Sequence, residues 1–326
     1  MATRRLFGGI DLGGTKIQTV VVNDGHEVLG EARHPTPTSG GPARVAAEMA
    51  AATRDAMAAA KLEPGGLAGI GVGSPGDVDE ERGTVSGARN LPDWEGSFEL
   101  GQALSASLGA PVKVGNDVGV ATQAEAQLGA GRAYRSLLGV FWGTGVGGGL
   151  VLDGRHWLGR GGAGEIGHMV VKVGGRRCTC GREGCMEAYA GRAAMEARAR
   201  KLHDDGRKTE LFKTMRKHGR DRLTSGIWER ALETGDKLAR ELIDEAVEAL
   251  GAGIASAVNL LDVEAVIIGG GIGVRLGQPY AERIANEMRP HLFNDHRPPA
   301  VEVAALGDLG GAIGAALLVA SSDGGR

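Results

Sequence analysis

The same local plan occurs twice in this chain: an apolar segment, a glycine-rich turn and a second apolar segment. It appears in LFGGIDLGGTKIQTVVVNDG, residues 6–25, and again in LLGVFWGTGVGGGLVLDG, residues 137–154. Apolar runs of this length around a glycine turn predict β-hairpins. Two hairpins with one layout, in a chain of 326 residues, predict two similar lobes that face each other across a cleft.

The turns of both hairpins are candidates for phosphate binding. Glycine turns leave backbone N–H groups free to face an anion, and Thr15 and Thr144 add hydroxyl donors. Asp11 could hold Mg²⁺ through water. Neither turn has the spacing of a P-loop, and a strand rather than a helix follows each. A single turn of this kind is usually a plain β-turn, but the repeated layout predicts one phosphate clamp in each lobe.

The rest of the chain alternates between the two kinds of regular structure. Apolar residues at helical spacing predict helices at 43–63, 186–202, 240–262 and 307–322, and buried strands are expected at 66–74 and 264–268. A short strand precedes Asn116 and Asp117, which open a helix that stops at Gly129. The charged, basic stretch 196–222 predicts solvated helices, with a phosphate- or partner-binding patch as the lesser alternative. The class is therefore α/β.

All three cysteines lie in one short segment, HMVVKVGGRRCTCGREGC, residues 168–185. An odd number of clustered thiols argues against a disulfide framework. Cys178, Cys180 and Cys185 with His168 supply three thiolates and one imidazole, a complete tetrahedral set for Zn²⁺. A closed set leaves no open position for a substrate. The segment therefore predicts a structural zinc loop, in preference to three reduced thiols in an ordinary loop.

Charge and hydropathy argue against two classes of partner. The 37 basic and 40 acidic residues leave a net charge of −3, which gives no reason to expect nucleic acid or a membrane surface. No run of about 18 apolar residues suggests a membrane span, and the first residues lack an apolar signal-peptide stretch. We expect a soluble, cytoplasmic protein.

Eight short motifs follow one another along the chain: DLGGTK at 11–16, GSPGDVD at 73–79, NLPDW at 90–94, GND at 115–117, GTGVGGG at 143–149, GEIGH at 164–168, CTCGREGCME at 178–187 and IIGGGI at 267–272. Their order resembles that of ROK-family sugar kinases, and the pattern is most like the ATP-dependent bacterial glucokinases of that family. The resemblance implies the two-lobed actin-like hexokinase (ribonuclease-H-like) fold. It also implies ATP-dependent phosphorylation of the 6-hydroxyl of glucose, structural zinc, and a homodimer or homotetramer.

The resemblance assigns a role to each matching position. Asp117 is implied as the general base toward the sugar hydroxyl. The sugar-binding positions are Asn90, Asn116, Asp117, Glu165, His168 and Glu187, and His168 serves zinc as well. The positions implied for ATP and Mg²⁺ are Asp11, Gly13, Gly14, Thr15, Lys16, Thr144, Gly145, Gly269, Gly270 and Gly271.

Each of the acidic candidates also has a plain structural interpretation. An aspartate at the start of a helix, such as Asp117, is usually an N-cap. Glutamates such as Glu165 are normally solvated, and Glu187 could simply favour the first turn of a helix. A carboxylate held in a rigid loop nevertheless accepts paired hydroxyl groups well, which is why we keep both glutamates as sugar ligands.

Several alternatives to a glucokinase stay open. N-acetylglucosamine and N-acetylmannosamine kinases of the same family share these motifs. Polyphosphate glucokinases generally lack the cysteine loop. Sugar-sensing repressors of the family carry an extra N-terminal helix-turn-helix, for which the few residues before Leu6 leave no room, and often lose the aspartate that Asp117 matches. A non-catalytic zinc-dependent scaffold would require both glycine turns to be idle.

The two-lobe interpretation also sets expected domain limits. The smaller lobe is expected to comprise residues 1–116, with the C-terminal helix 310–326 returning to it. The larger lobe is expected to comprise residues 117–309 and to contain the zinc-binding loop 168–185.

Overall fold

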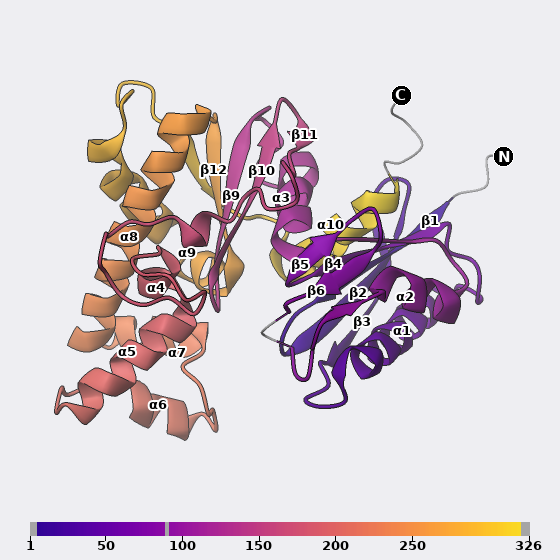
Figure 1. The fold of residues 1–326 in the computed structure, drawn as a ribbon, viewed down its shortest axis with the longest axis horizontal. Helices are drawn as coiled ribbons and strands as arrows, with labels where there is room; N and C mark the ends of the chain where they lie inside the picture. Colours follow the sequence, from indigo (N-terminus) through magenta and orange to yellow (C-terminus); the bar gives the residue numbers. More distant parts are fainter. Residues whose placement is uncertain (1–4, 89–90, 321–326) are drawn as a thin grey trace. The chain divides into compact units, whose positions relative to one another are not determined.

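The computed structural model describes residues 5–88 and 91–320, and its internal contacts divide the chain into two compact units (Figure 1). The first unit takes in the described parts of residues 1–129, 156–163 and 305–326, and the second takes in residues 130–155 and 164–304. By this division the first unit continues beyond Asn116 to Gly129. The domain limits 1–116 with 310–326, and 117–309, stay a prediction.

Each unit is built on a mixed five-stranded sheet, and the two sheets have the same topology. The first has the order β3-β2-β1-β4-β8 and the second the order β11-β10-β9-β12-β13. In the first sheet, β1 is antiparallel to β2 and parallel to β4, and β4 is parallel to β8. In the second sheet, β9 is antiparallel to β10 and parallel to β12, and β12 is parallel to β13. The strands are β1 (Leu6–Leu12), β2 (Lys16–Asn23), β3 (Val28–Pro35), β4 (Gly69–Ser74), β8 (Val112–Asn116), β9 (Leu137–Trp142), β10 (Val146–Leu152), β11 (Arg155–His156), β12 (Ala265–Gly269) and β13 (Ala300–Val303).

Helices and short strands complete both units. The first unit contains α1 (Gly41–Ala59), α2 (Leu100–Leu108), α3 (Asp117–Leu128), η3 (Gly307–Leu309), α10 (Gly310–Ala320) and a small sheet of β5 (Asp77–Asp79), β6 (Thr84–Ser86) and β7 (Ser97–Phe98). The second contains η1 (Ile166–His168), α4 (Glu187–Ala190), α5 (Arg192–Asp204), α6 (Leu211–Lys217), α7 (Ser225–Glu233), α8 (Lys237–Leu261), α9 (Gly270–Met288) and η2 (Arg289–His291).

The first sheet is covered on both faces, and the alternation of its side chains shows how. Ile10 and Leu12 of β1 pack in one core with α1 and α2, whereas Phe7 packs in another with α10. Residues separated by an even number along a strand share a face, so these two cores lie on opposite faces of the sheet. Asp11 belongs to the α10 face, which places it beside the start of that helix.

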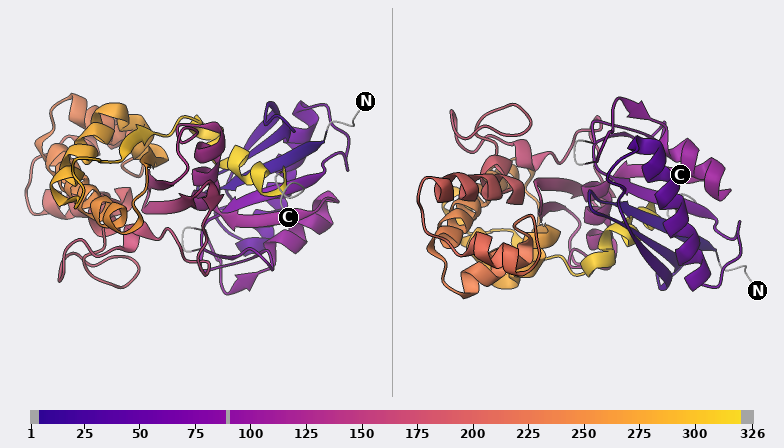
Figure 2. Two further views of the ribbon diagram at one scale, coloured as in Figure 1. Left: turned by 90° about the horizontal axis from the view of Figure 1, so that it is seen from above. Right: turned by 90° about the horizontal axis from the view of Figure 1, so that it is seen from below.

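Two glycines let α10 approach the first sheet closely. A Cβ atom at Gly9 would lie 1.9 Å from the carbonyl oxygen of Ala312, and one at Gly71 would lie 1.7 Å from that of Ala315. No other residue type fits these positions without moving the helix. The helix is drawn in yellow in Figure 2, where it runs along the indigo and purple sheet of the first unit.

Most of the expected elements are confirmed. The two hairpins are β1–β2 and β9–β10, and a helix does run from Asp117 to Leu128 with Gly129 at its end. The single helix expected over 186–202 was wrong, because the chain breaks at Gly191 into α4 and α5. Gly191 has an extended ψ of 131°, which interrupts the helical path. Among the described residues, no helix is long and apolar enough to cross a membrane.

A buried carboxyl group of the first unit binds the backbone of residues 305 and 306, where the chain returns to this unit. Glu125 of α3 is 3% exposed, and its oxygens accept hydrogen bonds from the N–H groups of Ala305 (3.0 Å) and Leu306 (2.9 Å). Buried carboxyl oxygens generally have hydrogen-bond donors in folded proteins. Glu125 therefore sets the position from which η3 and α10 continue.

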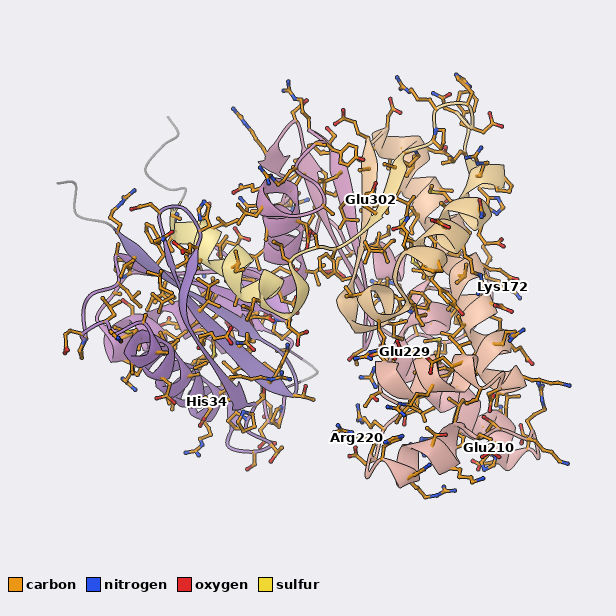
Figure 3. The ribbon with its side chains drawn as sticks, turned by 180° about the vertical axis from the view of Figure 1, so that it is seen from behind. His34, Lys172, Glu210, Arg220, Glu229 and Glu302 are labelled. Atoms are coloured by element: carbon orange, nitrogen blue, oxygen red, sulfur yellow. The ribbon has the colours of Figure 1, made fainter. Side chains whose placement is uncertain are left out.

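His34 of β3 joins β3 to α1 through two carboxylates and is labelled in Figure 3. Its Nδ1 lies 2.7 Å from Oε1 of Glu48, and its Nε2 lies 2.9 Å from Oδ2 of Asp55. The hydrogen bond to Glu48 is the main reason that the pKa of His34 is raised above its ordinary value, with burial acting against it. Only the protonated ring donates to both carboxylates.

Because the pKa of His34 is raised in the folded protein, its contribution to the free energy of unfolding depends on pH. The contribution of His34 is complete below the unfolded-state pKa of about 6.5 and is lost as the pH rises through the folded-state pKa. We therefore expect His34→Gln to lower the thermal midpoint more at about pH 5.5 than at about pH 9. Thermal unfolding of both proteins at the two pH values checks this, and an equal difference at both would contradict it.

Candidate functional site

The four predicted metal ligands lie together in the second unit. The ligand atoms of His168, Cys178, Cys180 and Cys185 are all within 4.8 Å of one another. The sulfur atoms of Cys180 and Cys185 are 3.7 Å apart, and Cys178 Sγ is 3.8 Å from Nδ1 of His168. All three cysteines are free thiols. The segment thus forms one compact cluster, as its sequence predicts.

The geometry of the cluster fits a tetrahedral zinc ion. Zinc–sulfur bonds of about 2.3 Å and zinc–nitrogen bonds of about 2.0 Å place neighbouring ligand atoms about 3.5 to 3.8 Å apart. The two closest separations in the cluster have this size. Burial raises the pKa of the Cys178 thiol, and raises the pKa of the Cys185 thiol to about 12. A cation at the centre is what would allow all three sulfurs to be thiolates.

Tight backbone turns wrap the loop around the cluster. The N–H of Cys178 donates to Arg182 (2.8 Å), and that of Gly181 donates back to Cys178 (3.0 Å). Gly184 has a φ of 80°, and a Cβ there would lie 1.9 Å from the carbonyl oxygen of Lys172. Only glycine combines that conformation with that approach. The loop is therefore shaped by its glycines as well as by the ligand set.

The ring of His168 has a different partner on each nitrogen. Nδ1 faces Cys178, whereas Nε2 lies 3.9 Å from Oε2 of Glu165. A carboxylate that hydrogen-bonds the second nitrogen of a ligating histidine orients the ring, and the present separation is longer than a hydrogen bond. The Glu165 side chain is 66% exposed, so it is accessible to a ligand from solvent. Glu165 and His168, both predicted sugar ligands, therefore lie side by side.

Glu187 connects the cysteine loop with the turn of the second hairpin. Its Oε2 accepts a hydrogen bond from the N–H of Val146 (3.0 Å) and lies against Gly145, where a Cβ would be 2.2 Å away. Its Oε1 accepts from the hydroxyl of Thr179 (3.4 Å) and lies 3.7 Å from Cys178 Sγ. The predicted sugar ligand Glu187 therefore stands between the metal cluster and the predicted phosphate turn.

The second predicted phosphate turn lies beside the glycines that end β12. A Cβ at Gly143 would lie 3.8 Å from the N atom of Gly271, and one at Gly270 would lie 2.6 Å from the backbone of Trp142. Gly270 also has a φ of 78°, and α9 begins there. The turn with Thr144 and Gly145 and the segment Gly269–Gly271 are thus brought together within the second unit, although about 125 residues separate them in the sequence.

The sequence analysis missed Arg192, which opens α5 beside this turn. The N–H groups of Arg192 and Ala193 donate to the carbonyl oxygens of Gly143 (3.1 Å) and Thr144 (3.0 Å). The Arg192 guanidinium also donates to the hydroxyl of Thr144 (2.9 Å). A helix break at Gly191 was the signal that could have revealed this residue, since a glycine that ends one helix can begin another.

The first predicted phosphate turn, Gly13 to Lys16, is held by Thr36. The Thr36 hydroxyl donates to the carbonyl oxygen of Gly13 (2.6 Å), and its N–H donates to that of Thr15 (3.2 Å). Gly14 and Thr15 are exposed at the tip of the turn. The Lys16 ammonium lies 3.9 Å from Asp308, so the positive charge beside the turn has a carboxylate partner.

Asp11 lies at the end of β1, behind the first turn. Its carboxyl group is so close to Gly311 that a Cβ there would be 2.7 Å from its Cγ. Burial raises the pKa of Asp11, Lys16 lowers it, and Asp308 raises it. A buried carboxyl group of this kind is stabilised in its charged form by a nearby cation, and the contact of Asp11 with hydrated Mg²⁺ stays a prediction.

Asn116 and Asp117 lie at the junction of β8 and α3, as expected. The residue that caps the helix is Asn116 and not Asp117. The Oδ1 of Asn116 accepts from the N–H groups of Val118 (3.1 Å) and Gly119 (3.0 Å), so Asn116 is the N-cap. Asp117 is the first helical residue, and its Oδ1 also accepts from Val118 (2.9 Å). The candidate Asn90 lies outside the described residues.

Residues 7–322 match the ROK family. The chain belongs to the ROK family. It is 31% identical to a glucokinase of Halalkalibacterium halodurans, over 97% of this chain and 95% of that one. It is 30% identical to an N-acetyl-D-glucosamine kinase of Escherichia fergusonii, over 96% and 99% of the two chains.

The fold agrees with a solved ROK structure. The crystal structure of a ROK family glucokinase from Streptomyces griseus, in complex with glucose and AMPPNP, is similar with a TM-score of 0.81 at 31% sequence identity. The match covers 96% of this chain and 98% of that one. The expected two-lobed α/β hexokinase fold is confirmed, with one five-stranded sheet in each unit.

Proposed function

We propose that this ROK protein phosphorylates the 6-hydroxyl of glucose with ATP. One observation carries most of the proposal: Glu187 contacts both the cysteine loop and the glycine turn of the second hairpin. The predicted sugar ligands Glu165, His168 and Glu187 therefore belong to the same unit as the predicted phosphate turn of the second hairpin, and Glu187 contacts that turn. The related Streptomyces griseus enzyme, which holds glucose and AMPPNP, supports the same substrates here.

Asp117 is the proposed general base. Phosphoryl transfer to an alcohol needs a positioned hydroxyl and an acceptor for its proton, together with neutralised phosphates. The Asp117 carboxyl group lies at the N-terminus of α3, the positive end of the helix dipole, and its Oδ1 accepts a hydrogen bond from Val118. Because Asn116 already caps the helix, the Asp117 carboxylate is not needed as the cap.

The other proposed roles follow the expected ones. Glu165, His168 and Glu187 bind sugar hydroxyls, together with Asn90 and the side-chain amide of Asn116. The metal loop would hold His168 and Glu187 in position for the sugar. In this loop zinc would be bound by His168, Cys178, Cys180 and Cys185. The residues proposed for ATP and Mg²⁺ are Asp11, Gly13, Gly14, Thr15, Lys16, Thr144, Gly145, Gly269, Gly270 and Gly271. Bound Mg²⁺ would neutralise the charge of the transferred phosphate.

An N-acetylhexosamine kinase is the second candidate. The Escherichia fergusonii N-acetyl-D-glucosamine kinase is as similar to this chain, within one per cent of identity, as the glucokinase of Halalkalibacterium halodurans. Both activities would use the same residues for the phosphoryl transfer itself.

We further propose that the protein is cytoplasmic and forms a homodimer or a homotetramer.

A comparison of sugars tests the substrate. We expect purified protein with Mg-ATP to release ADP with a higher kcat/KM for glucose than for N-acetylglucosamine, N-acetylmannosamine, mannose or fructose. With polyphosphate instead of ATP we expect no sugar phosphate. A preference for an acetylated sugar would retain the mechanism and change the substrate. If no sugar releases ADP from folded, zinc-loaded protein, the kinase proposal fails.

A further inference from the structure

Arg192 holds an unusual position at the second phosphate turn. It is the first residue of α5 and is half-buried. One end of its guanidinium donates to the hydroxyl of Thr144 (2.9 Å), and the other end donates to the carbonyl oxygen of Leu223 (3.0 Å). Both acceptors are neutral, so the side chain is held in place without being neutralised.

The contacts with α5 occupy two backbone acceptors of the turn and leave several of its donors available. The carbonyl oxygens of Gly143 and Thr144 are occupied by the first two N–H groups of α5. Within residues 5–88 and 91–320, the N–H groups of Thr144 and Gly145 have no hydrogen-bond partner. A hydroxyl that accepts from an arginine keeps its own hydrogen for another acceptor. Beside the Glu187 carboxylate, which lies against Gly145, the turn thus offers two N–H groups and one O–H group to an acceptor-rich ligand.

The positive charge of Arg192 also lacks a carboxylate partner. The nearest acidic group on its own helix, Glu196, is bound by Arg200 (2.6 Å) and by the N–H of Leu223 (3.0 Å). In the described part of the chain no carboxylate lies within 4.0 Å of the Arg192 guanidinium. Burial lowers the pKa of Arg192, Glu196 raises it, and the nearby Arg222 lowers it. A partly buried cation of this kind is stabilised by an anion.

We propose that Arg192 binds the phosphates of the phosphoryl donor and holds the Thr144 hydroxyl toward them. The inference deepens the proposed kinase function and rests on it. Arginine suits the role better than lysine, because its planar guanidinium can bond Thr144, Leu223 and an oxyanion at once. Because Arg192 bonds the phosphate turn itself, we expect it to contribute to the binding of the phosphates and not to that of the adenosine.

Calorimetric binding of three ligands to four proteins tests this. The ligands are Mg-ATP, Mg-ADP and adenosine, and the proteins are the native chain, Arg192→Met, Arg192→Lys and Lys201→Met. Loss of a charge-assisted hydrogen bond typically corresponds to a loss of affinity of roughly 10- to 100-fold. We expect that loss for Mg-ATP in Arg192→Met, with adenosine affinity unchanged. Arg192→Lys is expected to recover part of it. Lys201→Met, which removes a charge from an exposed position of the same helix, is expected to bind as the native chain does.

Steady-state kinetics adds a readout that damage to the fold would not give. We expect the KM for ATP to rise in Arg192→Met while the KM for sugar stays within about twofold, because only the donor loses a contact. Unchanged Mg-ATP binding in Arg192→Met would overturn the inference alone. An equal loss for adenosine and Mg-ATP would overturn it too, since it would indicate a general loss of structure. If the native chain binds no Mg-ATP, the proposed function fails together with the inference.

Discussion

Replacement of Asp117 by asparagine is expected to lower kcat for sugar phosphorylation by roughly 10²- to 10⁴-fold, the usual contribution of a positioned general base. The amide of asparagine has nearly the shape of the carboxylate but cannot accept the proton of the hydroxyl. Folding should be preserved, because the cap of α3 is made by Asn116 and not by Asp117. The KM values for sugar and ATP are expected to change much less than kcat.

Initial rates of ADP release, with thermal unfolding as the check on folding, measure this effect. Asp153→Asn is a matched control, since Asp153 is an exposed aspartate with a φ of 51°, a conformation that asparagine also adopts readily. It should leave the rate unchanged. An Asp117→Asn protein with native activity would exclude Asp117 as the base and leave the phosphoryl transfer without a proton acceptor among the proposed residues.

Replacement of Cys185 by serine is expected to remove zinc and to abolish sugar binding. Cys185 is fully buried, and its sulfur lies 3.7 Å from that of Cys180. Structural zinc sites in small domains contribute on the order of 10 kcal/mol of folding free energy, so the loop has little reason to stay folded without the ion. His168 and Glu187, which contact Cys178, would lose their positions with it.

Zinc content, amide hydrogen exchange and activity together measure this second effect. We expect one zinc per native chain and almost none in Cys185→Ser, with fast exchange across residues 170–185 and no measurable phosphorylation. Glu183→Gln removes a charge from an exposed position of the same loop and should keep both zinc and activity. A Cys185→Ser protein that retains full activity would show that the loop does not position the sugar ligands.

Features encoded by neighbouring residues were predictable from the sequence. The two hairpins follow from apolar runs around glycine turns, and both are present as β1–β2 and β9–β10. The zinc ligand set is nearly as local, since 18 residues contain all four side chains and the structure gathers their ligand atoms within 4.8 Å. Short-range patterns of this kind depend on backbone preferences and ligand chemistry, which act before any distant contact forms.

Features that depend on distant contacts were missed or only partly predicted. A continuous helix was expected over 186–202 because all the intervening residues suit a helix, and glycine costs it only about 1 kcal/mol. In the folded chain, Gly191 breaks the helix and a Cβ there would lie 2.9 Å from the carbonyl oxygen of Glu187. The break directs Arg192 to the turn of the second hairpin, which is 48 residues away in sequence.

The sequence alone thus determined the α/β class, the repeated hairpin and the composition of the metal cluster, because each is written in residues close together along the chain. Tertiary structure alone decided that Glu187 joins this cluster to Val146 and that Arg192 contacts Thr144. Which partner a carboxylate, guanidinium or amide group finds depends on the packing of segments far apart in sequence. Several partners are chemically equivalent to such a group, and only the folded chain selects among them.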